Sequence, residues 1–176
     1  MTDLPLAVVA PFVMGDMAGK REIAVQQGIA EAAKHEGVRK QLYELQSAVG
    51  DLPEVDCPLQ HVFAPGAYAR TIFIPMGTVI VGKIHKHQHL NILSQGEVLV
   101  ITEGAGLQTL RGPLTMVSPA GTKRALRALT DVVWTTIHLT DKTNLAEIED
   151  EVIAKDFEEY ERFIKGTTMK KIEVSA

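Results

Sequence analysis

The sequence predicts a mainly β protein: an antiparallel β-sandwich or β-barrel with helical extensions at both ends. Two observations support this prediction. Between Leu59 and Leu139, short runs of β-branched and apolar residues recur about every ten residues, separated by Gly, Pro and Asp. This texture is typical of antiparallel strands joined by turns. Before and after this region, apolar residues recur instead at helical spacing.

Length and composition are those of an ordinary globular chain. With 176 residues, 45% of them hydrophobic and 23% charged, the chain suits one domain with a sizeable core. Its 18 basic and 22 acidic residues give a net charge of −4, which argues against nucleic acid as a partner. Cys57 is the only cysteine, so an intrachain disulfide and a cysteine-rich zinc site are excluded.

The N-terminal region lacks the pattern of a targeting or membrane segment. The apolar stretch at residues 4–14 is interrupted by Pro5 and Pro11 and is too short to span a bilayer. Asp3 precedes it, where a signal peptide would carry Lys or Arg. We therefore expect a cytoplasmic protein with no membrane partner.

Residues 1–58 are expected to form an N-terminal arm and a helical segment. Residues 1–18 show no period and predict an irregular arm that docks on the body or on a partner. A helical pattern begins at Lys20, stops at the Glu36-Gly37 step and resumes in a second helix. One stripe of that second helix carries Val38, Leu42, Leu45 and Val49. Because either the barrel or a second copy can cover this stripe, we expect a homodimer or larger oligomer.

Residues 59–140 are expected to form the barrel itself. Its clearest strand-like runs are residues 71–74, 78–81, 97–102 and 132–137. The glycine-rich stretch at residues 103–106 predicts a hairpin turn, since no helical pattern follows it to make a phosphate-binding loop.

Residues 141–176 are expected to form a C-terminal helix and tail. Asn144, with Glu147 three residues later, is a typical helix start. One apolar face then extends through Leu145, Ile148, Val152, Ile153, Phe157, Tyr160 and Ile164. This pattern predicts one helix over about residues 144–165.

The strongest chemical signal is a cluster of histidines. Lys83, His85, His87 and His89 stand at alternate positions. On one uninterrupted strand they would share a face, because strand side chains alternate with period two. The polar residues 86–88 between two apolar runs favour a turn instead, which directs His87 to solvent while His85 and His89 converge from neighbouring strands.

From these residues onward the chain resembles the cupin superfamily, whose small antiparallel barrels carry two metal-ligand motifs. Its first motif, a Gly, five residues, His-x-His, three or four residues, Glu, six residues and Gly, falls on Gly77, Lys83, His85, His89 and Gly96. Its second, a Gly, five residues, Pro-x-Gly, two residues, His, three residues and Asn, falls on Pro113, Pro119, Gly121, Arg124 and Ala128, with Gly112 one place early. Lys83 and Arg124 replace histidines, and His89 replaces the Glu.

The resemblance implies a cupin-like antiparallel β-barrel (jelly roll) whose interior carries the functional residues. In the metal-binding interpretation, His85 and His89 hold a divalent transition metal such as iron, manganese, nickel or zinc, with His138 as a third ligand. In the alternative, they belong to a polar interior satisfied by hydrogen bonds and water. His138 follows Val132, Trp134 and Thr136 on one strand face, so it can also simply end a core strand.

Lys83 and Arg124 admit a different chemistry. If both cations lie inside one barrel, they can bind a carboxylate or phosphate, the Arg through its planar fork and the Lys as a point charge. The competing interpretation pairs them with Glu97 or Glu103. We expect the anionic ligand, because alternation places both glutamates on a strand face that resembles core or exterior.

A narrower resemblance is to cupin-like proteins of tailed-phage genomes. The shared segments are residues 63–66, 82–85, 121–124 and 134–138. This resemblance implies a phage or prophage origin and makes Lys83 and Arg124 features of that family.

Three classes of function follow from these residues. The first is a cupin-like small-molecule-binding protein with an anionic ligand bound by Lys83, His85, His89 and Arg124. The second is a metal-dependent oxygenase or isomerase that uses His85 and His89. The third is a structural protein that contacts virion proteins through its helices and arm. Fold alone does not decide among them.

Overall fold

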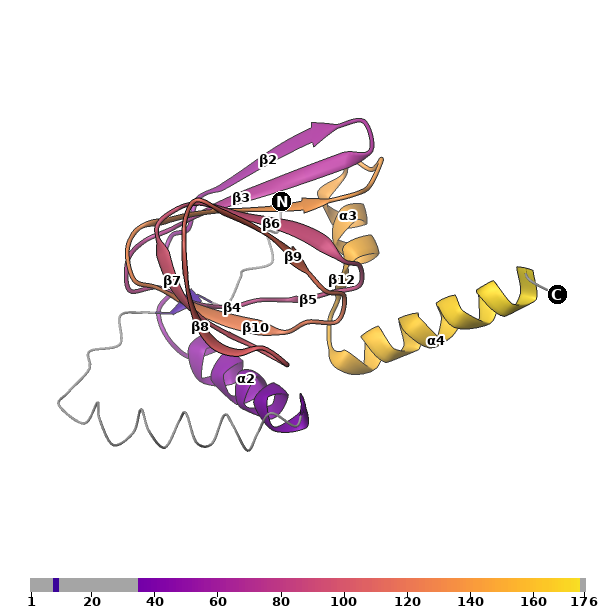
Figure 1. Cartoon of the computed structure of the whole chain (residues 1–176), viewed down its shortest axis with the longest axis horizontal. Helices are drawn as coiled ribbons and strands as arrows, with labels where there is room; N and C mark the ends of the chain where they lie inside the picture. Colours follow the sequence, from indigo (N-terminus) through magenta and orange to yellow (C-terminus); the bar gives the residue numbers. More distant parts are fainter. Residues whose placement is uncertain (1–7, 10–34, 175–176) are drawn as a thin grey trace.

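The computed structural model describes residues 8–9 and 35–174, which are mainly antiparallel strands flanked by three helices (Figure 1). The mainly β prediction is therefore confirmed. The strands do not close into one barrel. They form two five-stranded sheets that face each other, and a small two-stranded sheet at one end.

The first sheet has the strand order β1-β4-β10-β7-β8. Its strands are β1 (Val8–Val9), β4 (Val79–Val81), β10 (Arg124–Ala128), β7 (Glu97–Thr102) and β8 (Gly106–Arg111). The turn between β7 and β8 is the hairpin that residues 103–106 predict. Val8 and Val9 pair with Val79 and Ile80, so these two positions are a strand and not irregular backbone.

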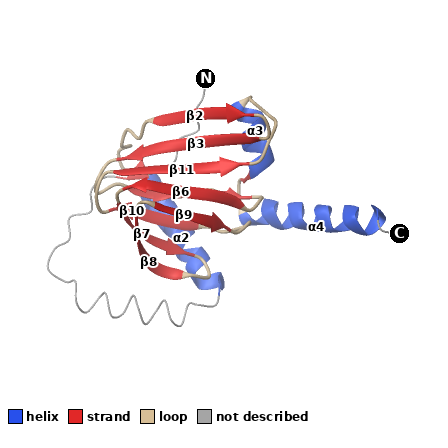
Figure 2. Ribbon diagram, turned by 45° about the horizontal axis from the view of Figure 1, so that its top comes forward, coloured by secondary structure: helices blue, strands red, loops and turns tan. Residues whose placement is uncertain are grey.

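The second sheet has the strand order β2-β3-β11-β6-β9 and faces the viewer in Figure 2. Its strands are β2 (Leu59–Ala64), β3 (Ala67–Ile74), β11 (Val132–His138), β6 (His89–Gln95) and β9 (Leu114–Ser118). Between β6 and β7 the chain passes from one sheet to the other at Gly96. Its φ of 94° and the carbonyl oxygen of Asp131, 2.3 Å from where a Cβ would lie, require glycine there.

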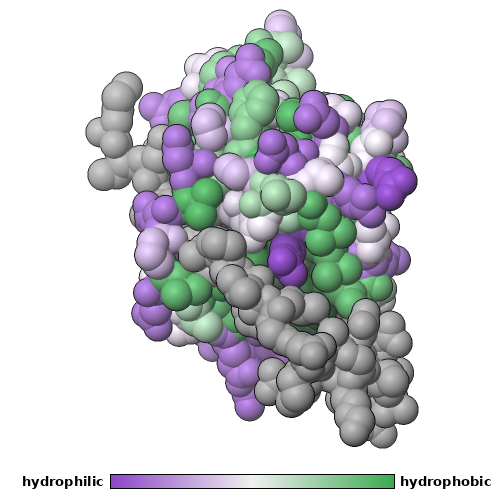
Figure 3. Space-filling model, turned by 90° about the vertical axis from the view of Figure 1, so that its left-hand side faces the viewer, coloured by the Kyte–Doolittle hydropathy of each residue, from purple (hydrophilic) through white to green (hydrophobic). Residues whose placement is uncertain are grey.

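The inward faces of the two sheets enclose the main core. Because strand side chains alternate, every second residue of each strand enters this layer. Its buried members are Ile72, Ile74, Ile80, Leu93, Val98, Val100, Leu126, Ala128, Val132 and Trp134. The opposite end of the molecule from α4 presents a mixture of polar and apolar side chains to the outside (Figure 3).

Helix α2 (His35–Gly50) packs on the outer side of the first sheet. Val38, Leu42 and Val49 are buried against Val81 and Ala125, whereas Leu45 stays 36% exposed. The stripe is thus covered by the chain's own sheet, which removes the reason for expecting it to bind a second copy.

The N-terminal boundary of α2 differs from the expectation. Glu36 and Gly37 lie in its first turn, where the sequence predicts a stop. Glycine is tolerated there because the first backbone N–H groups of a helix make no intrahelical hydrogen bond. The helical segment expected between Lys20 and residue 34 lies outside the described residues.

The single C-terminal helix predicted over residues 144–165 is wrong. The structure has two helices, α3 (Leu145–Val152) and α4 (Phe157–Val174), separated by strand β12 (Ile153–Ala154). β12 pairs with β5 (Ile84–His85), and this pairing requires extended backbone at Ile153. Asp156 then begins α4 by accepting a hydrogen bond from the backbone N–H of Glu159 at 2.7 Å.

Helix α3 begins where the sequence predicts. The side chain of Asn144 accepts hydrogen bonds from the backbone N–H groups of Ala146 and Glu147. Helix α4 projects away from the sheets (Figures 1 and 2). None of the helices in the described part of the chain is both long and apolar enough to cross a membrane.

The packing of α2 generates a stability prediction. Replacing Leu42, which is 1% exposed, with alanine leaves a cavity between helix and sheet and costs about 2–5 kcal/mol of unfolding free energy. Leu45→Ala, on the same helix, is the matched control and costs less than about 1 kcal/mol because Leu45 is partly exposed. Urea unfolding of the two variants measures the difference. Equal losses would contradict the difference in burial between Leu42 and Leu45.

Candidate functional site

A pocket of about 400 Å³ opens between the two sheets. Inward-facing residues of strands β2, β3, β4, β6, β10 and β11 line it, and helix α3 contributes Leu145, Ile148 and Glu149 at one side. Four of the residues singled out from the sequence, Lys83, His85, His89 and Arg124, line this pocket, and His138 does as well. The fold therefore brings all five candidate site residues to one cavity.

The polarity of the lining changes along the strands. On β3 the inward residues are Tyr68 and Arg70, followed by Ile72 and Ile74. On the antiparallel partner β11, His138 and Thr136 lie opposite the polar pair, and Trp134 and Val132 lie opposite the apolar pair. The inward-facing residues of β3 and β11 thus form a polar layer at the α3 end of the sandwich and an apolar layer beyond it.

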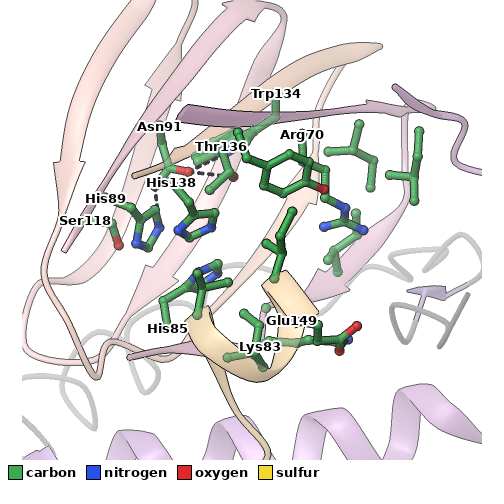
Figure 4. A pocket seen from close by; sticks show the side chains of 18 of the residues that line it. Arg70, Lys83, His85, His89, Asn91, Ser118, Trp134, Thr136, His138 and Glu149 are labelled. Carbon is green, nitrogen blue, oxygen red and sulfur yellow. Dashed lines mark hydrogen bonds and ion pairs between the residues drawn. The ribbon is translucent and has the colours of Figure 1, made fainter. Parts of the chain in front are cut away.

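Three histidine rings meet in the polar layer (Figure 4). His85 comes from β5, His89 from the start of β6 and His138 from the end of β11. Ring centroids are 4.1 Å apart for His85 and His89, and 4.9 Å apart for each of the other two pairs. One ring nitrogen from each residue lies within 4.8 Å of the other two. The turn predicted at residues 86–88 is what makes His85 and His89 converge.

Hydrogen bonds fix the orientation of the His89 ring. Its Nδ1 lies 3.1 Å from the carbonyl oxygen of His87, and since a carbonyl only accepts, Nδ1 carries the proton and Nε2 is the unprotonated nitrogen. The side-chain oxygen of Asn91 accepts hydrogen bonds from Trp134 Nε1 at 3.0 Å and Thr136 Oγ1 at 2.9 Å. The Asn91 amide nitrogen is thereby directed at His89 Nε2, 3.4 Å away.

Burial keeps the three imidazoles neutral. Desolvation lowers the pKa of His85 well below its usual value, and the neighbouring histidines and Arg124 lower it further. Desolvation also lowers the pKa of His89, and it is the main cause that brings the pKa of His138 to about 4. Nδ1 of His85 is buried without a hydrogen-bond partner. At neutral pH the cluster therefore offers uncharged imidazole nitrogens, the form that binds metal ions.

Arg124 is a partly buried cation next to this cluster. Its guanidinium donates to Ser118 Oγ at 2.5 Å, and burial lowers its pKa. Its charge is among the causes that lower the pKa values of His85 and His89. Within the described residues, no carboxylate forms an ion pair with it.

Lys83 has a partner that the sequence analysis did not weigh. Its ammonium group pairs with Glu149 on α3, and both side chains are about one-third exposed (Figure 4). The competing interpretation paired Lys83 and Arg124 with Glu97 or Glu103, but Glu97 forms an ion pair with Arg111 and Glu103 forms one with Arg39. Of the two cations Lys83 and Arg124, only Arg124 therefore forms no ion pair with a described carboxylate.

Sequence reasoning missed several lining residues. His61, which the sequence analysis did not single out, lines the pocket with Nδ1 2.7 Å from the Tyr68 hydroxyl. Arg70 also lines the pocket, and its charge lowers the pKa of His85 and His138. Alternation along β3 places Arg70 on the same face as Ile72, so this signal was available. His87 lies away from the three-histidine cluster, edge-on to the Phe163 ring at 5.2 Å.

Comparisons with known proteins find similarity in structure alone. No family model matches the chain, and no curated protein does. Similar solved structures include an RmlC-like cupin from Methanocaldococcus jannaschii, with 11% identity and a TM-score of 0.42 over 49% of this chain and 82% of that one. KdgF from a Halomonas species has 20% identity and a TM-score of 0.43, covering 52% and 86%. An acetylacetone dioxygenase from Acinetobacter johnsonii has 14% identity and a TM-score of 0.40, covering 47% and 59%.

The neutral imidazoles generate a pH prediction for metal-free protein. Unfolded histidine takes up a proton near pH 6.5, whereas folded His138 does so only near pH 4. The unfolded state thus binds more protons in this window, so unfolding free energy falls as pH is lowered from about 6.5 to about 4. We expect a loss on the order of 3 kcal/mol in the presence of chelator, reduced in His138→Gln. Denaturant melts across this range measure it, and a flat profile would contradict the burial of neutral histidine.

Proposed function

We propose that this protein binds a small anionic molecule beside a divalent transition metal ion held by His85, His89 and His138. The observation that carries the proposal is the meeting, in one pocket, of three neutral imidazoles and a partly buried arginine that forms no ion pair with a described carboxylate. The metal and the anion satisfy different parts of this polar layer.

The three histidines fit a metal ion by their chemistry. Imidazole suits zinc, iron, nickel and copper, and a site of three protein nitrogens leaves positions open for a ligand. The buried, unpartnered Nδ1 of His85 supports this assignment, because an unsatisfied buried polar atom is costly. The hydrogen bond between His89 and the His87 carbonyl resembles the outer-shell contact that orients metal-binding histidines.

Arg124 supports the anionic ligand. A buried guanidinium without a counter-charge is unfavourable, and a nearby divalent cation increases the repulsion. A carboxylate or phosphate that contacts both the Arg124 guanidinium and the metal ion balances both positive charges. The planar guanidinium matches the geometry of either group. Metal and anion should therefore bind with positive coupling, each raising the affinity for the other.

Catalysis is the second candidate. A metal ion with open positions acts as a Lewis acid toward an oxygen group of a bound molecule. The oxygenase or isomerase alternative rests on these open coordination positions. We assign no described side chain a role in proton transfer.

The proposed origin in a phage or prophage concerns the same residues. Of the four segments that resemble tailed-phage proteins, three supply pocket residues: Lys83 and His85, Arg124, and the Trp134 to His138 strand face. We infer that this pocket is the property shared with that family.

Metal content and titration test the first half of the proposal. Protein purified without chelator or affinity metal should contain about one equivalent of transition metal, measured by elemental analysis. His85→Ala, His89→Ala and His138→Ala should each lower Zn²⁺ affinity by more than the roughly 10- to 100-fold typical of outer-shell changes. His87→Ala is the matched control and should retain wild-type affinity. Unchanged metal content after replacing both His85 and His89 would refute the assignment.

Acetate binding tests the second half. Arg124→Gln should weaken acetate binding to the Zn²⁺-loaded protein by roughly 2 kcal/mol or more, because a buried charge pair loses one member. Circular dichroism should show an unchanged fold. Equal acetate affinity in wild type and variant would remove Arg124 from the site.

A further inference from the structure

The apolar layer beyond the histidines carries an inference about the class of ligand. The pocket does not end at the polar layer, since Ile74, Ile80, Leu126 and Trp134 line it as well. All four are at most 9% exposed and belong to the main core between the sheets. The cavity thus continues from charged and imidazole groups into hydrocarbon surroundings.

Strand register explains why both ends belong to one cavity. Arg124 and Leu126 are two residues apart on β10, so both point inward, and Leu126 lies opposite Ile80 of β4. Across the sandwich, His138 and Trp134 point inward from β11. Strands β10 and β11 thus each contribute residues to both the polar end and the apolar end.

On the premise of the proposed function, we propose that the anionic ligand is amphipathic: a carboxylic acid whose head lies at Arg124 and the three histidines, and whose hydrocarbon or aromatic body extends toward Ile74, Ile80 and Leu126. A volume of about 400 Å³ accommodates on the order of a dozen non-hydrogen atoms, if each takes roughly the 30 Å³ of a water molecule. A bare inorganic anion would leave the apolar end unfilled.

The test is a chain-length series measured by calorimetry. Acetate, butyrate, hexanoate and octanoate are titrated into the full-length protein, with and without one equivalent of Zn²⁺. Affinity should rise about two- to fourfold for each added methylene until the cavity is filled, since each buries apolar surface. 1-Hexanol, which has no anionic head, should bind more weakly than hexanoate.

Two variants separate head from tail. Arg124→Gln should weaken every carboxylate by a similar factor and leave the gain per methylene unchanged. Leu126→Gln, close in volume, should reduce the gain per methylene and leave acetate unaffected. Acetate binding without any gain along the series would overturn the amphipathic ligand and leave the proposed function standing. Failure of every carboxylate to bind would overturn both.

A second, independent observation concerns the outer face of the β2-β3-β11-β6-β9 sheet. An antiparallel sheet with one face in water normally alternates apolar inward and polar outward residues. Here the outward positions carry no charged side chain on any of the five strands; they are Gln60, Val62, Ala64, Ala67, Ala69, Thr71, Phe73, Leu90, Ile92, Ser94, Thr115, Val117, Val133, Thr135 and Ile137.

The register aligns these residues into rows across the sheet. Val62, Ala69, Ile137, Leu90 and Val117 are successive direct partners on β2, β3, β11, β6 and β9. Val62 and Val117, at the two edges, are 51% and 53% exposed. No described helix or loop lies in front of this face in Figure 2.

We propose that this face binds the same face of a second copy of the chain. A two-fold interface brings a surface against itself, so a face without charge meets its copy without like-charge repulsion. Five strands at about 4.8 Å spacing and roughly 20 Å of length give a footprint of roughly 500 Å² per copy. Two copies together reach about the 1,000 Å² that a biological interface needs.

Light scattering of the full-length protein tests this proposal. The wild type should have twice the 19.2 kDa chain mass, and the double variant Val62→Lys, Val117→Lys should be monomeric. Leu139→Lys, at an 86% exposed position outside the face, is the matched control and should stay dimeric. A monomeric wild type, or a dimer that survives both lysines, would overturn the proposal. A monomer that dimerises only after deletion of residues 1–34 would also overturn it, because the chain's own N-terminal segment would then occupy the face.

Discussion

The structure depends most on one constraint: polar side chains at the α3 end of the sandwich must be satisfied away from bulk water. Two β-sheets that face each other normally enclose only apolar residues, yet here three imidazoles and a guanidinium lie between them. Asn91 satisfies part of this layer through Trp134 and Thr136, and Ser118 accepts from Arg124. His85 Nδ1 lacks a hydrogen-bond partner and Arg124 lacks a counter-charge among the described residues. A bound ligand or metal ion would therefore stabilise this layer most at these two groups.

The elements with strong local signals could be predicted from the sequence. Alternation and turn residues sufficed for the four runs at residues 71–74, 78–81, 97–102 and 132–137, which overlap β3, β4, β7 and β11, and the Asn144 cap for the start of α3. Sheet closure was not decided by local pattern, because the same strands can form a barrel or two facing sheets. The split of the C-terminal helix was missed because Ile153 and Ala154 fit a helical face in sequence, while pairing with β5 decides their conformation. Non-local pairing overrides such patterns.

The candidate site was predictable to the extent that it depends on alternation and spacing. His85, His89 and His138 were found by their positions on strands and around a turn, and the structure brings them together. The partner of Lys83 was not predicted, because Glu149 is 66 residues away along the chain and reaches Lys83 only through the placement of α3. His61 and Arg70 were missed for a different reason: alternation places Arg70 on the face of Ile72, but a single polar residue among apolar neighbours shows its role only once the opposing sheet is known.

The short β5–β12 pairing has a mechanical consequence. Ile153, next to the end of α3, lies opposite His85 itself, and the backbone N–H of Lys86 donates to the Val152 carbonyl at 2.7 Å. The wall of the cavity and one of its three imidazoles are thus attached at the same point. Because these hydrogen bonds join the end of α3 to the strand that carries His85, a displacement of α3 also displaces His85. The position of α3 at the side of the cavity and the geometry of the histidine cluster are therefore coupled.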